Sequence, residues 1–330
     1  MRNRKTIFLL IATSMCCLLA IVPILMSYSL SGPVKVLQRQ DYKGWNDAIV
    51  MSNGIVEVVI VPSISRVMQF RFIDDADGPF WNNPELEGQY VEDSAWLSHP
   101  GSYGGDKIWP APQSDWSWPP PPDMDNGHCD YRVLDDMSVE LSSPVSRSQG
   151  VLLTRRISLS PDKAEMHIES SFRKVEGEPS TVSVWTITQA KQPLALYMEL
   201  AKLRVFKDGY LAMQGDSAKN VRVENGLLRL LPDASQNQKI GNDGSRILWV
   251  GEDDMLMMEM PRKNAVYPDN GCSMELYTNA APLEYVELET LSPLARLSVG
   301  DTLQETTTYT LFKRKSENAD QDAKEALGVK

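Results

Sequence analysis

Apolar and polar residues alternate with a period of two along most of the chain after residue 31. This pattern predicts β-strands, because successive side chains of a strand point to opposite faces. Glycine, proline, asparagine and aspartate lie at the joints, where they favour turns. The predicted strands are 55–61, 67–72, 133–141, 151–159, 165–172, 181–188, 227–231, 247–250, 255–260, 273–277, 285–291 and 302–312. Many short strands joined by turns predict an all-β fold, a large antiparallel β-sandwich or a barrel.

The N-terminal segment differs from the rest because it is apolar over a long run. Arg2, Arg4 and Lys5 precede residues 6–30, which hold no charged side chain. A positive start followed by an apolar run predicts a secretory signal peptide, and about 20 apolar residues also span a bilayer. Cleavage near residue 31 and retention as a membrane anchor both fit this pattern. In either case we expect an exported protein of the periplasm or cell envelope that meets the membrane only through this segment.

The remainder of the chain is expected to form one domain with a short tail. The strand pattern predicts a β-sandwich domain over residues 32–315. Residues 316–330 are polar, charged and only weakly helical in pattern. We expect this C-terminal tail to fray.

One internal segment, residues 95–128, shows almost no strand pattern. It holds Trp96, Trp109, Trp116 and Trp118, together with a run of prolines at 119–122. Disordered segments lack aromatic residues, and proline lowers the entropy cost of a fixed loop shape. The composition therefore predicts a stiff, ordered loop lying across the sheet, and long loops of this kind commonly carry function.

The charge balance excludes one class of partner. The chain has 33 basic and 44 acidic side chains and a net charge of −11. An acidic surface without a basic stripe repels phosphate backbones. We therefore expect no nucleic-acid partner.

Cysteine and metal-ligand spacing predict little chemistry. Outside the N-terminal segment the chain has Cys129 and Cys272, for which a disulfide and two buried thiols are both compatible with the sequence. His128 and Cys129 have no matching pair at zinc spacing. The sequence predicts no metal site and no cofactor.

Three stretches together resemble a known family. They are NGIVEVVIVPSISRVMQF (53–70), GGDKIWPAPQSDWSWPPPP (104–122) and YVELETLSPLARLSVGDTL (285–303). They are similar to an uncharacterised bacterial family of the domain-of-unknown-function type, DUF4380, which is grouped by fold with the galactose mutarotase-like sandwiches. The resemblance covers roughly residues 45–312. It implies a galactose mutarotase-like supersandwich and a carbohydrate ligand, a sugar or oligosaccharide.

The resemblance to aldose 1-epimerases implies a catalytic base but not its partner. These enzymes carry a glutamate base in a late strand reading about L-E-T-Q before a proline, and LETLSP at 288–293 matches except at the glutamine. Glu289 is therefore implied as the base. The histidine that they use as general acid has no counterpart in the comparable strand 183–189, which holds Trp185 and Gln189. Neither side chain can cycle a proton near pH 7, so simple mutarotation by the usual pair is not expected.

Several residues have the chemistry that a sugar site needs, which is a flat aromatic face with charged or amide groups beside it. Arg66, in the turn PSISR, is implied as a ligand contact by the resemblance. The 104–118 stretch and strand 183–189 supply the other predicted ligand contacts, Asp106, Lys107, Trp109, Gln113, Trp118, Trp185 and Gln189. The plain alternative is that the tryptophans plug the sheet while the charged groups are solvated.

Two glutamates are predicted as a catalytic pair. Alternation places Tyr285, Glu287 and Glu289 on one face of strand 285–291. Neighbouring carboxylates raise each other's pKa, which suits acid–base work, although a solvated outer face gives the same pattern. Glu275 and Tyr267 are further candidate ligand contacts.

The sequence thus predicts a carbohydrate-binding protein of the bacterial envelope. An epimerase-like reaction is left open, with Glu289 or Glu287 as base and Asp106 or Lys107 as the second proton carrier. The alternative is a non-catalytic envelope protein whose loop of tryptophan and proline docks a protein partner.

Overall fold

The computed structural model describes residues 33–92, 95–96, 102–116, 118–202, 205–216 and 219–329. The predicted signal or anchor at residues 1–31 lies outside the described residues, as does His99. Among the residues that are described, no helix is long and apolar enough to cross a membrane.

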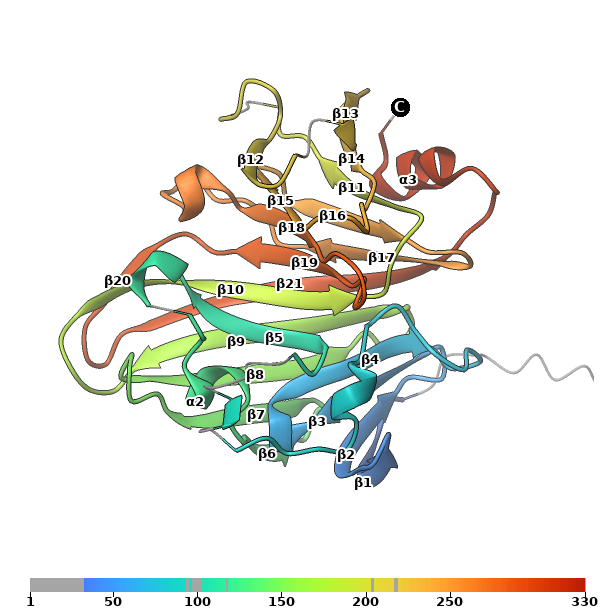
Figure 1. Cartoon of the computed structure of the whole chain (residues 1–330). Coiled ribbons are helices and arrows are strands. Elements are labelled where there is room, and N and C mark those ends of the chain that lie inside the picture. Colours follow the sequence, from blue (N-terminus) through green and yellow to red (C-terminus); the bar gives the residue numbers. More distant parts are fainter. Residues whose placement is uncertain are drawn as a thin grey trace, which may run out of the picture. The chain divides into compact units, whose positions relative to one another are not determined.

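The described residues form two large sheets, and every registered strand pair is antiparallel (Figure 1). The first sheet contains the strands that carry the site described below. In spatial order its strands are β1 (Lys35–Tyr42), β2 (Trp45–Ser52), β3 (Val56–Val61), β4 (Arg66–Phe72), β5 (Gly105–Ala111), β10 (Ser180–Ala190), β19 (Val286–Leu291), β18 (Met274–Thr278), β15 (Gln238–Asn242) and β12 (Leu211–Gln214), with β20 (Ala295–Leu297) paired to β10.

The second sheet packs behind the first. In spatial order its strands are β13 (Val221–Glu224), β14 (Leu227–Leu230), β11 (Ala195–Glu199), β16 (Arg246–Val250), β17 (Asp254–Glu259), β21 (Thr302–Lys313), β9 (Glu165–Lys174), β8 (Val151–Leu159), β7 (Val139–Val145) and β6 (Asp130–Val133). Helices are short. They are α2 (Pro122–Asp125) and α3 (Ala319–Leu327), with 3-10 turns at Pro62–Ile64, Pro84–Leu86, Gln113–Asp115 and Asp269–Gly271.

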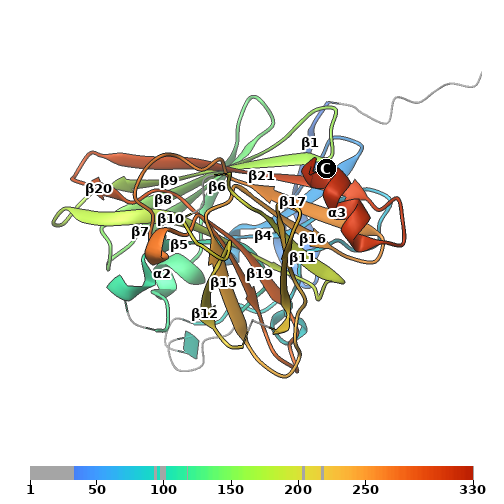
Figure 2. The same ribbon diagram turned by 90° about the horizontal axis from the view of Figure 1, so that it is seen from above.

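The main core lies between the two sheets (Figure 2). Ile60 and Leu288 of the first sheet and Ile168 and Leu256 of the second belong to one buried apolar cluster. Burial of such side chains between facing sheets is the main stabilising contribution in a β-sandwich. The sandwich expected from the alternating pattern is therefore present.

The alternating pattern located most strands but misjudged residues 133–141. This range is not one strand, because β6 ends at Val133 and β7 begins at Val139. Met137 between them has φ of 60°, and the Leu134 amide donates to the Ser138 carbonyl at 2.8 Å. The apolar residues Val133, Leu134 and Met137 therefore span a hairpin turn.

The segment expected to be a loop contains a central strand, β5. Its residues are all buried, and they include a charged pair, Asp106 and Lys107, so no apolar–polar alternation marks the strand. Its pairing with β4 is limited to Val67 and Asp106. At Pro110 the strand is thus open on one side, a position where proline is tolerated. The expectation of a strandless loop over 95–128 was wrong for 105–111.

The C-terminal tail was expected to fray, but residues 319–327 form helix α3. The Asn318 side chain caps its N-terminus and Gly328, with φ of 65°, ends it. Ala323 and Leu327 are buried against the second sheet. An apolar stripe too short to stand out in a charged sequence is thus sufficient to dock the helix.

The two cysteines of the described region do not pair. Cys129 and Cys272 are both buried and free. Of the two readings of the sequence, the structure matches that of separate buried thiols.

Candidate functional site

The strand register brings distant residues onto one face of the first sheet. Trp109 of β5 pairs with Trp185 of β10, and Lys107 pairs with Ile187. The Lys107–Ile187 row continues across β19, β18 and β15 as Glu289–Glu275–Gly241, and the row beside it reads Gln189–Glu287–Tyr277–Lys239. Because directly opposed residues of a sheet share a face, these odd-numbered side chains all point away from the second sheet.

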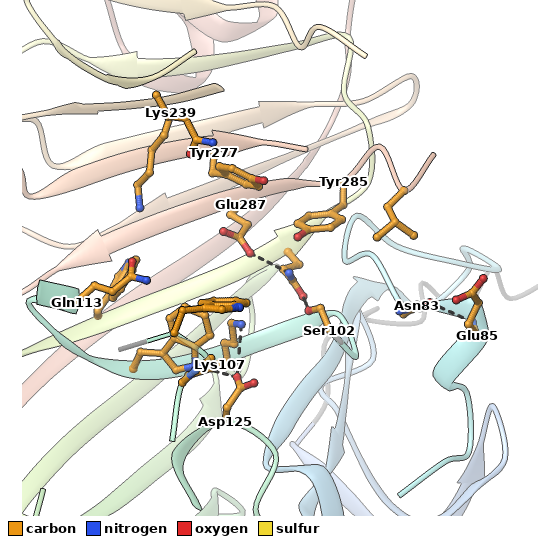
Figure 3. Close-up of a pocket in the computed structure, with 17 residues that line it drawn as sticks. Asn83, Glu85, Ser102, Lys107, Gln113, Asp125, Lys239, Tyr277, Tyr285 and Glu287 are labelled. Atoms are coloured by element: carbon orange, nitrogen blue, oxygen red, sulfur yellow. Dashed lines mark hydrogen bonds and ion pairs between the residues drawn. The ribbon is translucent and has the colours of Figure 1, made fainter. Parts of the chain in front are cut away.

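A cavity of about 450 Å³ lies over this face (Figure 3). Gln113, Trp118, Pro120 and Asp125, from the segment that follows β5, line part of it. The aromatic residues that line it are Trp109, Trp118, Trp185, Tyr277 and Tyr285. The polar lining includes Lys107, Gln113, Asp125, Gln189, Lys239 and Glu287. Figure 3 shows Lys239 extending from its strand toward the side of the cavity where Gln113 and Lys107 lie.

Trp109 is the centre of the aromatic wall. Its ring meets that of Trp185 edge to face at 5.4 Å, Trp116 at 5.6 Å and Trp118 at 6.3 Å. Edge-to-face contacts of this kind fix ring positions. Trp118, at the rim, is 60% exposed, so one flat apolar surface stays open to a ligand.

Lys239 holds two buried carboxylates beneath the cavity. Its Nζ lies 2.8 Å from Glu275 Oε2 and 2.9 Å from Glu289 Oε2. Trp185 Nε1 also donates to Glu289 Oε2 at 2.6 Å. Both carboxylates are fully buried and neither lines the cavity. Glu289, which the resemblance implies as catalytic base, is therefore bound by Lys239 and Trp185 beneath the cavity floor.

This cluster places two buried carboxyl groups around one ammonium group. Burial raises the pKa of Glu275 well above its usual value, and the nearby Glu289 raises it further, against the lowering effect of Lys239. Burial lowers the pKa of Lys239, but Glu289 and Glu275 outweigh it, so the net shift is upward. These directions favour a protonated Glu275 beside a charged Lys239.

A second ionic cluster lies on the β5 side. Asp125 Oδ1 is 3.0 Å from Arg66 Nη2 and 3.4 Å from Lys107 Nζ, and it accepts from Trp109 Nε1 at 2.8 Å. The Lys107 Nζ also lies 3.6 Å from the Trp109 ring centre. Burial lowers the pKa of Lys107, partly opposed by Asp125.

Glu287 is the predicted catalytic residue that reaches the cavity. Its Oε1 accepts from Gln189 Nε2 at 2.8 Å, and Gln189 Oε1 in turn accepts from the Ser102 hydroxyl. Burial raises the pKa of Glu287, and Glu289 raises it further. A carboxylate with a raised pKa beside an open cavity is suited to accept a proton near neutral pH.

The structure brings most of the predicted residues together and leaves others apart. Lys107, Trp109, Gln113, Trp118, Trp185, Gln189 and Glu287 line the cavity. Glu275 and Glu289 lie beneath it. Arg66 is buried behind Asp125, and Tyr267 does not line the cavity, because its hydroxyl accepts from the Lys263 amide and its ring stacks under Arg262.

The prediction that Asp106 contacts the ligand is wrong. Asp106 neighbours Lys107 in β5, so it points to the opposite face, into the layer between the sheets. There it pairs with Arg155 and accepts from Thr188 Oγ1 at 2.7 Å and from Tyr309 at 2.6 Å. It cannot contact a ligand in the cavity or relay a proton to it.

Sequence reasoning missed several lining residues. Lys239 stands in the short stretch QKIGN, which carries no distinguishing pattern. Asp125 lies in a turn-like sequence at α2. Tyr277 could have been predicted from the alternation of side chains, because it lies two residues from Glu275 on the same strand and therefore on the same face.

The described residues contain no group of three or more histidine, cysteine, aspartate or glutamate side chains placed to hold a metal ion. The lining residues identified above contain no histidine. The chemistry available here is therefore that of carboxylates, lysines, amides and aromatic rings.

No protein-family model and no curated protein sequence matches the chain. Solved structures do. A galactose mutarotase-like protein from Lactobacillus casei matches with a TM-score of 0.54 and 9% identity, over 80% of this chain and 100% of that one. A candidate aldose 1-epimerase from Klebsiella pneumoniae matches with a TM-score of 0.59 and 8% identity, over 90% and 87%. A galactose mutarotase related enzyme from Lactobacillus acidophilus matches with a TM-score of 0.52 and 9% identity, over 80% and 97%. At such identities the likeness shows the fold alone, and the chain has the fold of the galactose mutarotase-like proteins.

Proposed function

We propose that the chain is a carbohydrate-binding protein whose sugar or oligosaccharide ligand occupies the cavity over β5, β10, β19, β18 and β15. One observation carries the proposal. Aromatic rings and hydrogen-bonding side chains alternate around one cavity, with Trp109 and Trp185 beside Lys107, Gln189 and Glu287. Sugars present apolar C–H faces and many hydroxyls, so they need both kinds of contact.

Two further facts support a small polar ligand. The cavity volume of about 450 Å³ falls in the usual range for ligand pockets, roughly 300–1,000 Å³. The galactose mutarotase-like solved structures that share the fold carry sugar-related names.

An epimerase-like reaction, if present, is proposed to use Glu287 as base. Glu289 is bound by both Lys239 and Trp185 and is fully buried, whereas Glu287 lines the cavity. Of the two predicted second proton carriers, Lys107 lines the same cavity and Asp106 does not. The proton-transfer groups would then be Glu287 and Lys107.

Docking of a protein partner by the loop of tryptophan and proline is the second candidate. The observation that favours it is the exposure of Trp118. Trp96 and Trp109 of the same segment are buried within this protein and offer no docking surface. Membership in DUF4380, export, and location in the periplasm or envelope also stay proposals.

The test is a titration of intrinsic tryptophan fluorescence with a panel of mono- and oligosaccharides, using the full chain. A sugar that binds here should change the emission saturably, because three lining residues are tryptophans. Trp118→Ala should weaken binding about 3- to 10-fold through loss of the stacking surface. Tyr90→Ala is the control, since Tyr90 is an exposed aromatic residue that does not line this cavity.

A saturable response that Trp118→Ala leaves unchanged would place the sugar elsewhere. If no sugar in the panel changes the emission or raises the melting temperature, the carbohydrate proposal is wrong. Docking of a protein partner would then be the better account.

A further inference from the structure

Two buried cations share one carboxylate at the β5 side of the cavity. Arg66 is 0% exposed, Lys107 4% and Asp125 2%. A single oxygen, Asp125 Oδ1, faces Arg66 Nη2, Lys107 Nζ and Trp109 Nε1. With both basic groups charged, this cluster has a surplus of one positive charge.

The surplus is poorly compensated by the described part of the chain. Arg66 Nε and Nη1 are buried and have no hydrogen-bond partner among the described residues. Taking an unpaired charge out of water is costly, and a nearby counter-charge must offset the cost. The lowered pKa of Lys107, caused first by burial and also by Arg66, agrees with a missing anion.

Among the described residues, neither of the other acidic residues that line the cavity, Glu85 and Glu287, forms an ion pair with Lys107 or Arg66, although the charge of Glu287 raises the pKa of Lys107 from a distance. Glu287 accepts from Gln189 and shares its surroundings with Glu289, which raises its pKa. Glu289 of β19 and Glu275 of β18 are held by Lys239 of β15, on the side of β10 away from β5. The site thus has two cations around one carboxylate on the β5 side, and three carboxyl groups around Lys239 on the side of β18 and β19.

We propose that the ligand is a sugar with an acidic substituent, such as the carboxylate of a uronic acid, whose anion lies against Lys107 in the cavity. The inference rests on the proposed function and narrows it to anionic carbohydrate. Of the two cations beside Asp125, Lys107 lines the cavity and Arg66 does not. The chain as a whole is acidic, but at contact distance in a water-poor cavity the local cation outweighs screened charges farther away.

The experiment compares matched pairs of sugars by calorimetric titration of the full chain. Galactose is paired with galacturonate and glucose with glucuronate, together with short oligomers of each. The uronates should bind at least about tenfold more tightly, as expected for a charge-assisted hydrogen bond. Lys107→Gln should remove this preference and Lys107→Arg should keep most of it. Lys191→Gln, at an exposed lysine outside the cavity, should have no effect. Melting temperatures of the variants verify that they fold.

Three results would overturn the inference in distinguishable ways. Equal binding of neutral and acidic sugars removes it and leaves the proposed function intact. A uronate preference that survives in a folded Lys107→Gln variant places the anion elsewhere. Absence of binding by every sugar, neutral and acidic, removes the proposed function together with the inference.

Discussion

The two faces of strand β5 carry adjacent charged residues with opposite surroundings. Asp106 points into the layer between the sheets, where its carboxylate pairs with Arg155 and accepts from Thr188 and Tyr309. Lys107 points into the cavity, where it competes with Arg66 for Asp125. On the first face charges balance one to one, whereas on the second they do not.

The difference separates a structural polar group from one available to a ligand. In the Asp106 pair the charges balance and Asp106 accepts further hydrogen bonds, although Arg155 Nε has no partner among the described residues. Such a pair has no surplus charge to offer a ligand. A cluster with surplus charge and unmade hydrogen bonds at a cavity is arranged for something that binds. Both clusters are equally buried, so burial alone would not have distinguished them.

The strongest way to break this comparison is to remove Arg155. Arg155→Met leaves the Asp106 carboxylate buried without its cation, and we expect the free energy of unfolding to fall by about 3–5 kcal/mol. Urea denaturation measures the change. Arg156→Met is the control, because Arg156 is the next residue, points to the other side and pairs with exposed Asp136, and it should cost about 1 kcal/mol or less. Equal losses in the two variants would contradict a structural role for the Asp106 pair.

A smaller effect is expected at Glu275, with a sign that depends on pH. Its folded-state pKa is raised, so its contribution to stability is greatest below pH 4.5 and is lost as pH rises toward the folded-state pKa. Glu275→Gln removes this loss, and the variant should be more stable than the parent at pH 8 by about 1 kcal/mol, but not at pH 4. Urea denaturation at both pH values, with exposed Glu224→Gln as control, tests this. A variant less stable at pH 8 would show that the ion pair with Lys239 outweighs burial.

The smallest effect on stability is expected at the rim of the cavity. Gln113 is exposed and lines the cavity, so Gln113→Ala should change the free energy of unfolding by no more than about 0.5 kcal/mol. Its loss should nevertheless weaken sugar binding by about 1 kcal/mol, the net contribution of one hydrogen bond. Parallel denaturation and calorimetry separate the two quantities. A large loss of stability would place Gln113 among the structural residues instead.

The sequence predicted the strands that follow simple alternation. In β8, every second residue from Val151 to Leu159 is buried, including Arg155, while the residues that alternate with them are more exposed, and the predicted range 151–159 is the observed one. Strand β5 escaped prediction because burial on both faces erases the alternation and its charged residues find partners far along the chain. Such pairing depends on tertiary contacts that no local pattern encodes.

The site residues could be predicted only where a strand was recognised, because alternate side chains of a strand lie on the same face. Glu287 was found because it stands in a recognisable strand, and the tryptophans were found from their density. Lys239 and Asp125 were missed because each lies in a short unremarkable stretch, placed only by the order of strands in the sheet. Asp106 was assigned to the site because residues 95–128 were predicted to be a loop. Without a predicted strand, nothing indicated that Asp106 and Lys107 point to opposite faces.

The order of strands around β10 has a consequence for when the cavity forms during folding. β10 pairs on one side with β5 and on the other with β19, so the cavity joins residues 107 and 287, which are 180 positions apart. Closing such long segments carries an entropy cost that must be met before the contacts form, and non-local pairing folds slowly. During synthesis the cavity cannot be completed until β18 and β19 have emerged, so a chain ending before residue 286 would lack the binding site whatever its partial folding.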